Sequence, residues 1–171
     1  NIGFKIIDAI NSHFKLSKQK PKFKGLLTTG NIDEKKIYAI KPLTFMNNSG
    51  TAIKELIDYF KIDAKDVIVF HDDMDIDFGK VKAKFGGTSA GHNGIESIDK
   101  FIGKDYSRVR IGIGHPKQKK KVNNHVLEDF KEDEEEKIKE ITENIVKQIP
   151  TLIDKKIDLF SSKVNQNLNG I

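Results

Sequence analysis

The sequence contains no cysteine, so disulfide bonds, thiol chemistry and thiolate metal sites are excluded. No apolar run approaches the ~20 residues that a membrane-spanning helix requires, and no signal peptide is visible. These absences leave the cytosol as the simplest compartment. The first residue is Asn1 and not methionine, and we therefore expect that the chain as written is not a primary translation product.

The composition is that of a folded, basic protein. A length of 171 residues with 37% hydrophobic residues suits one globular domain. Although 32% of the residues are charged, apolar residues recur throughout the chain, which argues against wholesale disorder. The net charge of +5 favours a polyanionic partner such as nucleic acid, but a lysine-rich surface without such a partner would give the same charge.

Helical and strand periodicities alternate along the chain. In the first half we predict a helix at Asn1–Phe14, a basic loop at Ser17–Lys24, strands at Gly25–Thr29 and Lys36–Ile40 around a turn at Gly30–Asp33, a helix capped by Ser49 that runs to Phe60, and a buried strand at Val67–Phe70. In the second half we predict a strand at Gly79–Phe85, a glycine-rich loop at Gly86–Gly91, a helix at Asn93–Ile102, a strand at Arg108–Gly114, a basic loop at Lys117–Lys121, a helix at Glu132–Ile149, a short helix after Pro150 and a polar C-terminal tail at 161–171. This mixture predicts an α/β fold, namely a single three-layer domain over residues 1–171 with a mixed β-sheet sandwiched by helices.

Three polar clusters lie at the ends of predicted elements, where sites tend to be built. The first is Lys41–Gly50, which leads from a strand into a helix. Its residues Asn47 and Asn48 offer amides that both donate and accept hydrogen bonds. For an arbitrary segment of this kind, a capped turn is the simpler interpretation.

The second cluster, His71–Asp75, directly follows the buried strand. Its three carboxylates and one histidine could bind magnesium or zinc. Successive residues of an extended segment face opposite ways, however, so Asp72 and Asp73 cannot easily share one ion. A carboxylate that orients a catalytic histidine fits the cluster equally well.

The third cluster, Phe85–Gly94, joins the glycine-rich loop to the start of a helix. Glycines allow a substrate to approach the backbone closely, and the free N–H groups of a helix start favour anions. The loop lacks the Lys-Ser or Lys-Thr ending of a P-loop, which disfavours nucleotide hydrolysis. On its own, His92 could be a plain helix cap.

Basic side chains flank these clusters on two alternating strands, at Lys80, Lys82, Lys84, Arg108 and Arg110. Residues two apart on a strand share a face, so Lys82 and Lys84 can line one surface. That surface could bind the phosphates of a nucleic-acid backbone. It could equally be the solvated side of a sheet.

Taken together, the clusters resemble the bacterial-type peptidyl-tRNA hydrolases. The resemblance is carried, in order and spacing, by Lys41-Pro-Leu-Thr-Phe-Met-Asn-Asn-Ser-Gly50, His71-Asp-Asp-Met-Asp75, Gly79-Lys-Val, Lys84-Phe-Gly-Gly, Gly91-His-Asn-Gly94 and Arg108-Val-Arg-Ile-Gly-Ile-Gly-His-Pro116. It implies the family fold, a mixed sheet sandwiched by helices. It also implies hydrolysis of the ester between peptide and tRNA, which recycles stalled or dropped-off peptidyl-tRNA and frees tRNA for translation, with no metal and no cofactor.

The resemblance also implies roles for individual residues. Asn47 and Asn93 would bind the peptidyl-tRNA near the scissile ester and either hold the attacking water or donate to the developing oxyanion. Asp72 would orient the catalytic histidine. Further substrate contacts would come from Phe45, Met46, His92, Lys84 and Arg110. The last two would clamp the 5′-phosphate at the tRNA acceptor stem.

The start of the chain departs from the family pattern. The family's catalytic histidine lies in a His-Asn-x-Gly-Phe pattern, and this chain opens with Asn1-Ile-Gly-Phe4, which places that histidine directly before Asn1. We expect an N-terminally truncated chain that lacks the family's first strand, its Gly-Asn-Pro-Gly segment and a tRNA-contacting tyrosine, and that has little or no activity. If it were active, His71, His92 or His115 would be candidates for the base.

Two other functions stay open on the sequence. A non-catalytic RNA-binding relative of the same fold would bind tRNA without cleaving the ester, but Asn47, Asp72 and Asn93 all persist at motif positions, which favours catalysis. A metal-dependent hydrolase comes third. The expected partner is peptidyl-tRNA and not a membrane, and we expect a monomer in the cytoplasm.

Overall fold

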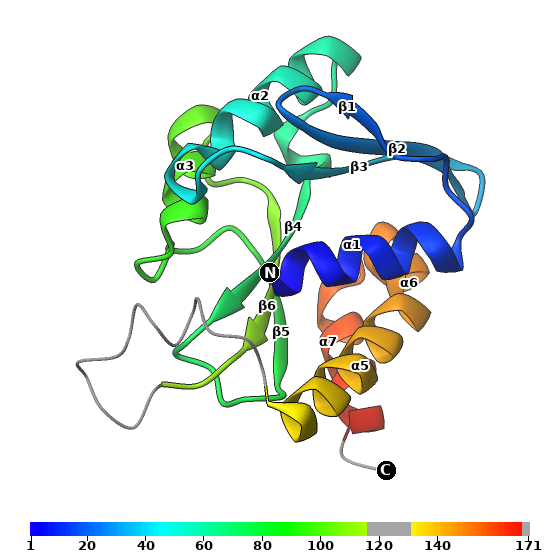
Figure 1. Cartoon of the computed structure of the whole chain (residues 1–171), viewed down its shortest axis with the longest axis vertical. Coiled ribbons are helices and arrows are strands. Elements are labelled where there is room, and N and C mark those ends of the chain that lie inside the picture. The colour runs from blue at the N-terminus through cyan, green and yellow to red at the C-terminus, as the bar shows by residue number, and fades with distance from the viewer. Residues whose placement is uncertain (116–130, 169–171) are drawn as a thin grey trace.

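The computed structural model describes residues 1–115 and 131–168 (Figure 1). At its centre is a mixed sheet in the order β4-β6-β5, in which β4 and β6 are parallel and β5 is antiparallel to β6. Strands β4, β5 and β6 span Ile68–Asp73, Val81–Phe85 and Ser107–Gly112. The basic loop predicted at Lys117–Lys121 lies outside the described residues.

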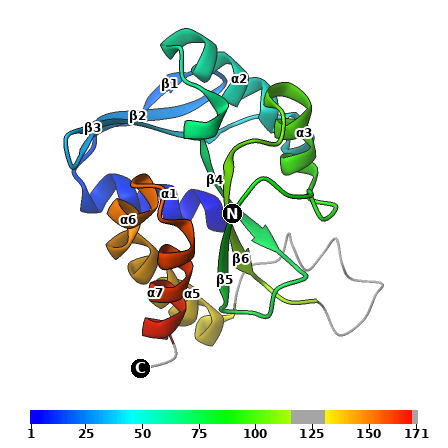
Figure 2. The same cartoon turned by 180° about the vertical axis from the view of Figure 1, so that it is seen from behind.

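Helices cover both faces of this sheet, with α1, α5, α6 and α7 on one side and α2 and α3 on the other (Figure 1, Figure 2). In chain order they span Ile2–His13, Ser49–Phe60, Asn93–Ile102, Glu132–Lys147, Ile149–Ile153 and Ile157–Leu168, as α1, α2, α3, α5, α6 and α7. Strand alternation explains the division, because Phe70, Val109 and Ile111 pack with the first group while Val69 packs with α2 and α3. The fold is therefore the predicted α/β class. Since both clusters share one sheet, we infer a single domain.

Helix α1 confirms the helix predicted at the start of the chain. The side-chain oxygen of Asn1 accepts a hydrogen bond from the N–H of Phe4 at 3.1 Å and so caps the helix. Gly3 lies directly on β4, because a Cβ there would be 2.6 Å from the main-chain oxygen of Phe70. The start of α1 is thereby held against the middle of β4.

A separate antiparallel sheet has the order β1-β2-β3, over Lys20–Lys22, Gly25–Ile32 and Lys35–Pro42. Its tight turn is Asp33–Glu34, with φ of 48° and 66°. The predicted turn at Gly30–Asp33 is wrong, because strand pairing continues as far as Ile32, which is buried in the core. The predicted loop at Ser17–Lys24 contains β1, where Pro21 is tolerated because β1 is an edge strand.

The start of α2 packs closely against α3. Gly50 makes this possible, since a Cβ there would lie 2.3 Å from the main-chain oxygen of Ser97, and its N–H donates to the Ser97 hydroxyl at 2.9 Å. Ser49, predicted as the cap of α2, is instead its first residue, and its hydroxyl donates to the carbonyl of Met46 at 2.8 Å. The close packing holds the 3-10 turn Met46–Asn48 beside the start of α3.

Helix α7 lies where a polar tail was predicted at 161–171. Its Phe160 and Val164 are fully buried, and its Asn165 pairs with the backbone of Val81 in β5 through bonds of 3.1 and 2.7 Å. Polar side chains of this segment thus form hydrogen bonds with the backbone at the outer edge of β5 and are not merely solvated. None of the helices within residues 1–115 and 131–168 has the length and apolarity needed to cross a bilayer.

Strand β4 forms the other edge of the central sheet within the described residues. A largely apolar cavity of about 720 Å³ lies beside it, between α1, β3 and α2. Its lining extends from Ile10 and Ile32 to His71, Asp72 and His92. One end of the cavity therefore reaches the polar residues at the carboxyl end of β4.

Candidate active site

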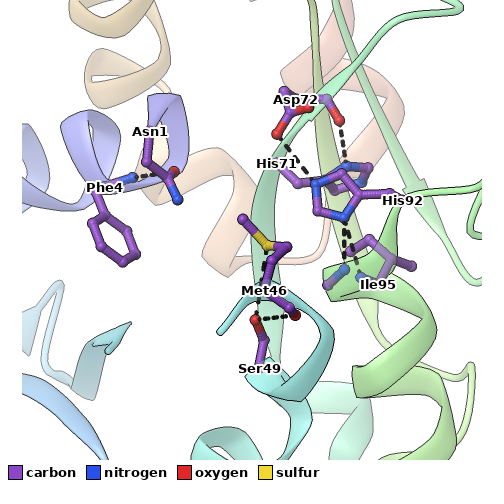
Figure 3. A network of polar contacts seen from close by, with 9 residues as sticks. Asn1, Phe4, Met46, Ser49, His71, Asp72, His92 and Ile95 are labelled. Atoms are coloured by element: carbon purple, nitrogen blue, oxygen red, sulfur yellow. Dashed lines mark hydrogen bonds and ion pairs between the residues drawn. The ribbon is translucent and has the colours of Figure 1, made fainter. Parts of the chain in front are cut away.

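The carboxyl end of β4 meets the start of α3, and Asp72 and His92 are hydrogen-bonded there. The distance from Asp72 Oδ1 to His92 Nε2 is 3.2 Å (Figure 3). Asp72 lies near the end of β4, and His92 is the N-cap of α3. The second and third polar clusters of the sequence therefore meet in one place.

Both ring nitrogens of His92 are occupied. Its Nδ1 accepts hydrogen bonds from the main-chain N–H groups of Gly94 and Ile95, at 3.1 and 3.2 Å (Figure 3). An acceptor at Nδ1 requires the proton to be on Nε2, which then donates to Asp72. The simple interpretation of His92 as a helix cap is therefore confirmed. In this arrangement His92 has no free lone pair with which to act as a base.

Asp72 is held as a carboxylate. Burial by itself would raise its pKa, but the hydrogen bond from His92 and the electrostatic interaction with that ring outweigh burial, so the pKa lies below its ordinary value. A carboxylate accepts several hydrogen bonds, so Asp72 can orient a second imidazole as well as that of His92.

His71 is a buried neutral histidine behind this pair. Its side chain lies on the opposite face of β4 from Asp72, it is 7% exposed, and its Nδ1 donates to the main-chain oxygen of Asp72 at 2.9 Å. The centres of the His71 and His92 rings are 5.0 Å apart. Burial, followed by the proximity of His92, lowers the pKa of His71 to about 4.

This buried histidine should make the fold sensitive to mild acid. The pKa of His71 is lower in the folded chain, about 4, than its ordinary 6.5, so between these pH values the unfolded chain binds more protons. The stabilisation that neutral His71 contributes is complete above pH 6.5 and is lost as the pH falls toward 4. This loss amounts to roughly 3 kcal/mol in the free energy of unfolding. The free energy of unfolding, measured by urea titration from pH 7 to pH 4, should fall less steeply in His71→Asn, which keeps a donor for the Asp72 carbonyl.

The matched control is His13→Gln, at an exposed histidine of α1. It should keep the pH dependence of the parent chain. Equal slopes for His71→Asn and the parent would mean that His71 is not the group that titrates.

Asn47 and Asn93, the two amides expected to bind substrate, lie on neighbouring turns. Asn47 is the middle residue of the 3-10 turn before α2, and Asn93 is the first residue of α3. Met46 contacts the α3 backbone so closely that a Cβ on Gly94 would lie 2.8 Å from its sulfur. Both asparagine side chains are exposed to solvent. The first polar cluster thus joins the other two.

Exposed apolar side chains lead into this turn. Leu43, Phe45 and Met46 are 61%, 86% and 44% exposed. Met46 also lines the cavity beside β4, and Figure 3 shows it between Ser49 and the start of α3. Three large apolar side chains exposed within four residues favour a binding role for this segment. Sequence reasoning singled out Phe45 and Met46 but missed Leu43, which only its exposure distinguishes.

Strands β5 and β6 present basic side chains on one face. In their register Lys82 is opposite Arg110 and Lys84 is opposite Arg108, so all four share that face. The Nε of Arg110 donates at 2.9 Å to Asp73, which is only 6% exposed and fixes the guanidinium. The expected pair, Lys84 and Arg110, therefore occupies diagonal positions on one surface.

Arg108 is not part of the exposed basic surface. It is 1% exposed and forms an ion pair with Asp99 of α3 at 2.8 Å. Its guanidinium is not accessible to phosphates, because α3 and the glycine-rich loop cover its end of the shared face.

The three carboxylates at the end of β4 and directly after it do not converge on one point. The pairs are Asp72 with His92, Asp73 with Arg110 and Asp75 with His115. In the part of the chain that the structure describes, no group of three or more histidine, cysteine, aspartate or glutamate side chains is placed to hold a metal ion. His71 and Asp73 lie on one face of β4 and Asp72 on the other. This alternation could have been used in the sequence to predict that His71 and Asp73 share the face of the basic side chains.

Comparison with known proteins gives consistent matches over nearly the whole chain. The family model described as peptidyl-tRNA hydrolase matches residues 1–170. A peptidyl-tRNA hydrolase of Pelagibacter ubique is 74% identical over 165 residues, which are 96% of this chain and 89% of that protein. One of Bartonella henselae is 44% identical over 170 residues, 99% of this chain and 88% of that protein. The crystal structure of the peptidyl-tRNA hydrolase from Acinetobacter baumannii is similar, with a TM-score of 0.89 and 29% identity, over 96% of this chain and 85% of that one.

Proposed function

The chain belongs to the peptidyl-tRNA hydrolase family, and we propose that Asn47, Asp72 and Asn93 form the centre at which it cleaves the ester between peptide and tRNA. Hydrolysis of peptidyl-tRNA releases free tRNA for translation. The proposal is supported above all by the meeting of three clusters that are far apart in the sequence, through the His92–Asp72 hydrogen bond and the contact between Met46 and Gly94. The non-catalytic RNA-binding alternative is not favoured.

In the proposed reaction, water attacks the ester carbonyl and forms a tetrahedral oxyanion. The exposed amides of Asn47 and Asn93 donate hydrogen bonds to this oxyanion or hold the water. Both side chains are exposed, and neither forms a hydrogen bond within the described residues, so both are available to a substrate. Collapse of the intermediate breaks the bond to the ribose oxygen, which takes up the proton that the base removed from the water, and leaves the peptide with a free carboxyl group.

The general base of this reaction is a histidine that Asp72 orients. We propose that it is the residue directly before Asn1, because the histidines of the described residues fit the role poorly. His92 uses both ring nitrogens, and His71 is buried with a pKa of about 4, which makes it a weak base at neutral pH. Asn1 and Asp72 both line the cavity beside β4, which supports this assignment.

The tRNA is held on two sides of the reaction centre. Phe45, Met46 and His92 contact the substrate next to the ester, where the first two provide apolar surface. Lys84 and Arg110 clamp the 5′-phosphate of the acceptor stem, with Arg110 oriented by Asp73. In this proposal the enzyme acts as a monomer. Its compartment is the cytoplasm, where tRNA is used in translation.

The phosphate clamp gives the experiment that tests this function. In the full-length enzyme, Lys84→Ala and Arg110→Ala should weaken tRNA binding and each reduce the slope of log K against log salt by about 1. Cleavage of a minimal aminoacyl-nucleoside ester should hardly change, because that substrate has no 5′-phosphate to hold. Turnover of both substrates is measured over a range of salt concentrations.

Lys139→Ala, at an exposed lysine of α5, removes the same charge elsewhere and is the matched control. It should leave the salt slope unchanged. Thermal melting of Arg110→Ala is measured in parallel, because this variant leaves the buried Asp73 without its partner. Equal losses on both substrates would contradict the clamp.

A further inference from the structure

Arg108 is the most deeply buried charged residue of the described chain. Its guanidinium donates through Nη1 to the main-chain oxygen of Thr88 at 3.1 Å and through Nη2 to Asp99 at 2.8 Å. The guanidinium carbon also lies 4.5 Å from the centre of the Tyr106 ring. One side chain of β6 thus binds the glycine-rich loop and helix α3 at the same time.

The link to α3 does not depend on the link to the loop. Asp99 also accepts a hydrogen bond from the Tyr106 hydroxyl at 2.8 Å, so β6 and α3 are joined twice. The bond to Thr88 is the contact that reaches the loop, and a planar fork is needed to serve Thr88 and Asp99 together. The hydrogen bond to Thr88 is not needed to hold α3 on the sheet, because the two bonds to Asp99 already do so.

The loop that Arg108 holds leads directly to the reaction centre. Gly87, Ala90 and Gly91 all have positive φ, of 108°, 48° and 79°, so the loop has no regular structure of its own. From Thr88 the chain continues to Ser89, whose carbonyl accepts the N–H of His92 at 2.9 Å. The next residue is Asn93.

We propose that Arg108 is a positioning residue for the hydrolytic reaction. By fixing the Thr88 carbonyl it fixes the turn through Ser89 and His92, and with it the direction of the Asn93 amide relative to Asp72. A displacement of about 1 Å at a reacting group can cost about 10²-fold in rate. The hydrogen bond from Arg108 to Thr88, five residues before Asn93, should therefore have a measurable effect on turnover. The inference rests on the proposed role of Asn93 in the reaction.

The test uses Arg108→Lys in the full-length enzyme. Lysine keeps a positive charge for Asp99 but has no fork with which to reach Thr88 as well. We expect kcat to fall by up to about 10²-fold, with KM for peptidyl-tRNA and the salt dependence of tRNA binding unchanged. A loss confined to stability would lower the melting temperature and leave kcat of the folded enzyme as it was, which would overturn the inference.

A double-mutant cycle with Asn93→Ala shows whether Arg108 acts through Asn93. If it does, Arg108→Lys lowers kcat in the parent and not in the Asn93→Ala background. Losses that multiply would overturn the inference while leaving the role of Asn93 intact. An Asn93→Ala variant with unchanged kcat would remove both the inference and the proposed role of Asn93.

Two further variants cover the case in which Arg108→Lys does not fold. Tyr106→Phe removes one bond to Asp99 but no contact to the loop, and should keep the parent kcat. Asp99→Asn weakens the ion pair that holds the guanidinium, and should lower kcat without changing KM. A lower kcat for Tyr106→Phe than for Asp99→Asn would contradict a role for Arg108 in holding the loop.

Discussion

Replacement of the residue directly before Asn1 by alanine in the full-length enzyme should lower kcat for peptidyl-tRNA by about 10²–10⁴-fold, the usual contribution of a positioned general base. We expect that residue to be a histidine. The 171-residue chain, which begins after it, should hydrolyse peptidyl-tRNA at a similarly low rate. Both rates are measured by release of free tRNA at a saturating substrate concentration.

The reason lies in how the described histidines are bonded. In His92, Nδ1 accepts from two backbone N–H groups and Nε2 donates to Asp72. It can therefore orient the carboxylate but cannot take a proton from water. His71 donates Nδ1–H to a backbone carbonyl, and burial keeps its pKa near 4. Asp72 itself, with a lowered pKa, is better suited to orient a base than to serve as one.

The matched control is His115→Gln, since His115 pairs with Asp75 on the exposed surface. It should keep the parent rate in the full-length enzyme. A normal rate of cleavage by the 171-residue chain would contradict the assignment and place the base within it. In that event His115→Gln and His71→Asn in this chain would identify the residue.

The sequence predicted the elements with strong periodicity. The helix at the start, the helix ending at Phe60 and the helix from Asn93 agree with the structure. The strand predicted at Val67–Phe70 overlaps β4, which continues to Asp73. Each has an apolar face that must be buried against the same sheet, so local pattern and tertiary packing agree. The polar clusters at their ends consequently converge in space.

Tertiary contacts decided the elements that the sequence did not predict. The turn after β2 lies at Asp33–Glu34 because Ile32 is drawn into the core, which extends the strand beyond the glycine. The segment after Ser161 is helical because Asn165 satisfies the edge of β5, although its composition resembles a solvated tail. Neither partner is close in sequence, so no local pattern could indicate it.

The candidate site also depends on contacts between residues that are distant in the sequence. The residues Asn47, Asp72 and Asn93 could be identified from motifs, but the bonds that orient them could not. Whether an arginine on a strand faces solvent depends on what covers it, and only the structure separates the buried Arg108 from the accessible Arg110. Their spacing along the strand places both on one face, so the strand pattern by itself does not distinguish them.

Asn93→Ala should lower kcat by about 10²–10³-fold, which corresponds to about 2.7–4 kcal/mol of lost transition-state stabilisation. The amide is exposed at the start of α3, beside the Asp72–His92 pair, where it can donate to the oxyanion. KM should change little, because this bond strengthens only as negative charge develops on the oxygen. The measurement is single-turnover release of tRNA from peptidyl-tRNA in the full-length enzyme.

Two variants separate this role from a structural one. Asn93→Asp keeps the shape of the side chain but replaces the donor by a charged acceptor, so it should be at least as slow as Asn93→Ala. Asn48→Ala deletes a neighbouring amide that makes no side-chain cap bond to α2, and should keep the parent rate. If Asn93→Asp were as fast as the parent, donation to the oxyanion would have to come from Asn47 alone, because an ionised carboxylate cannot supply it.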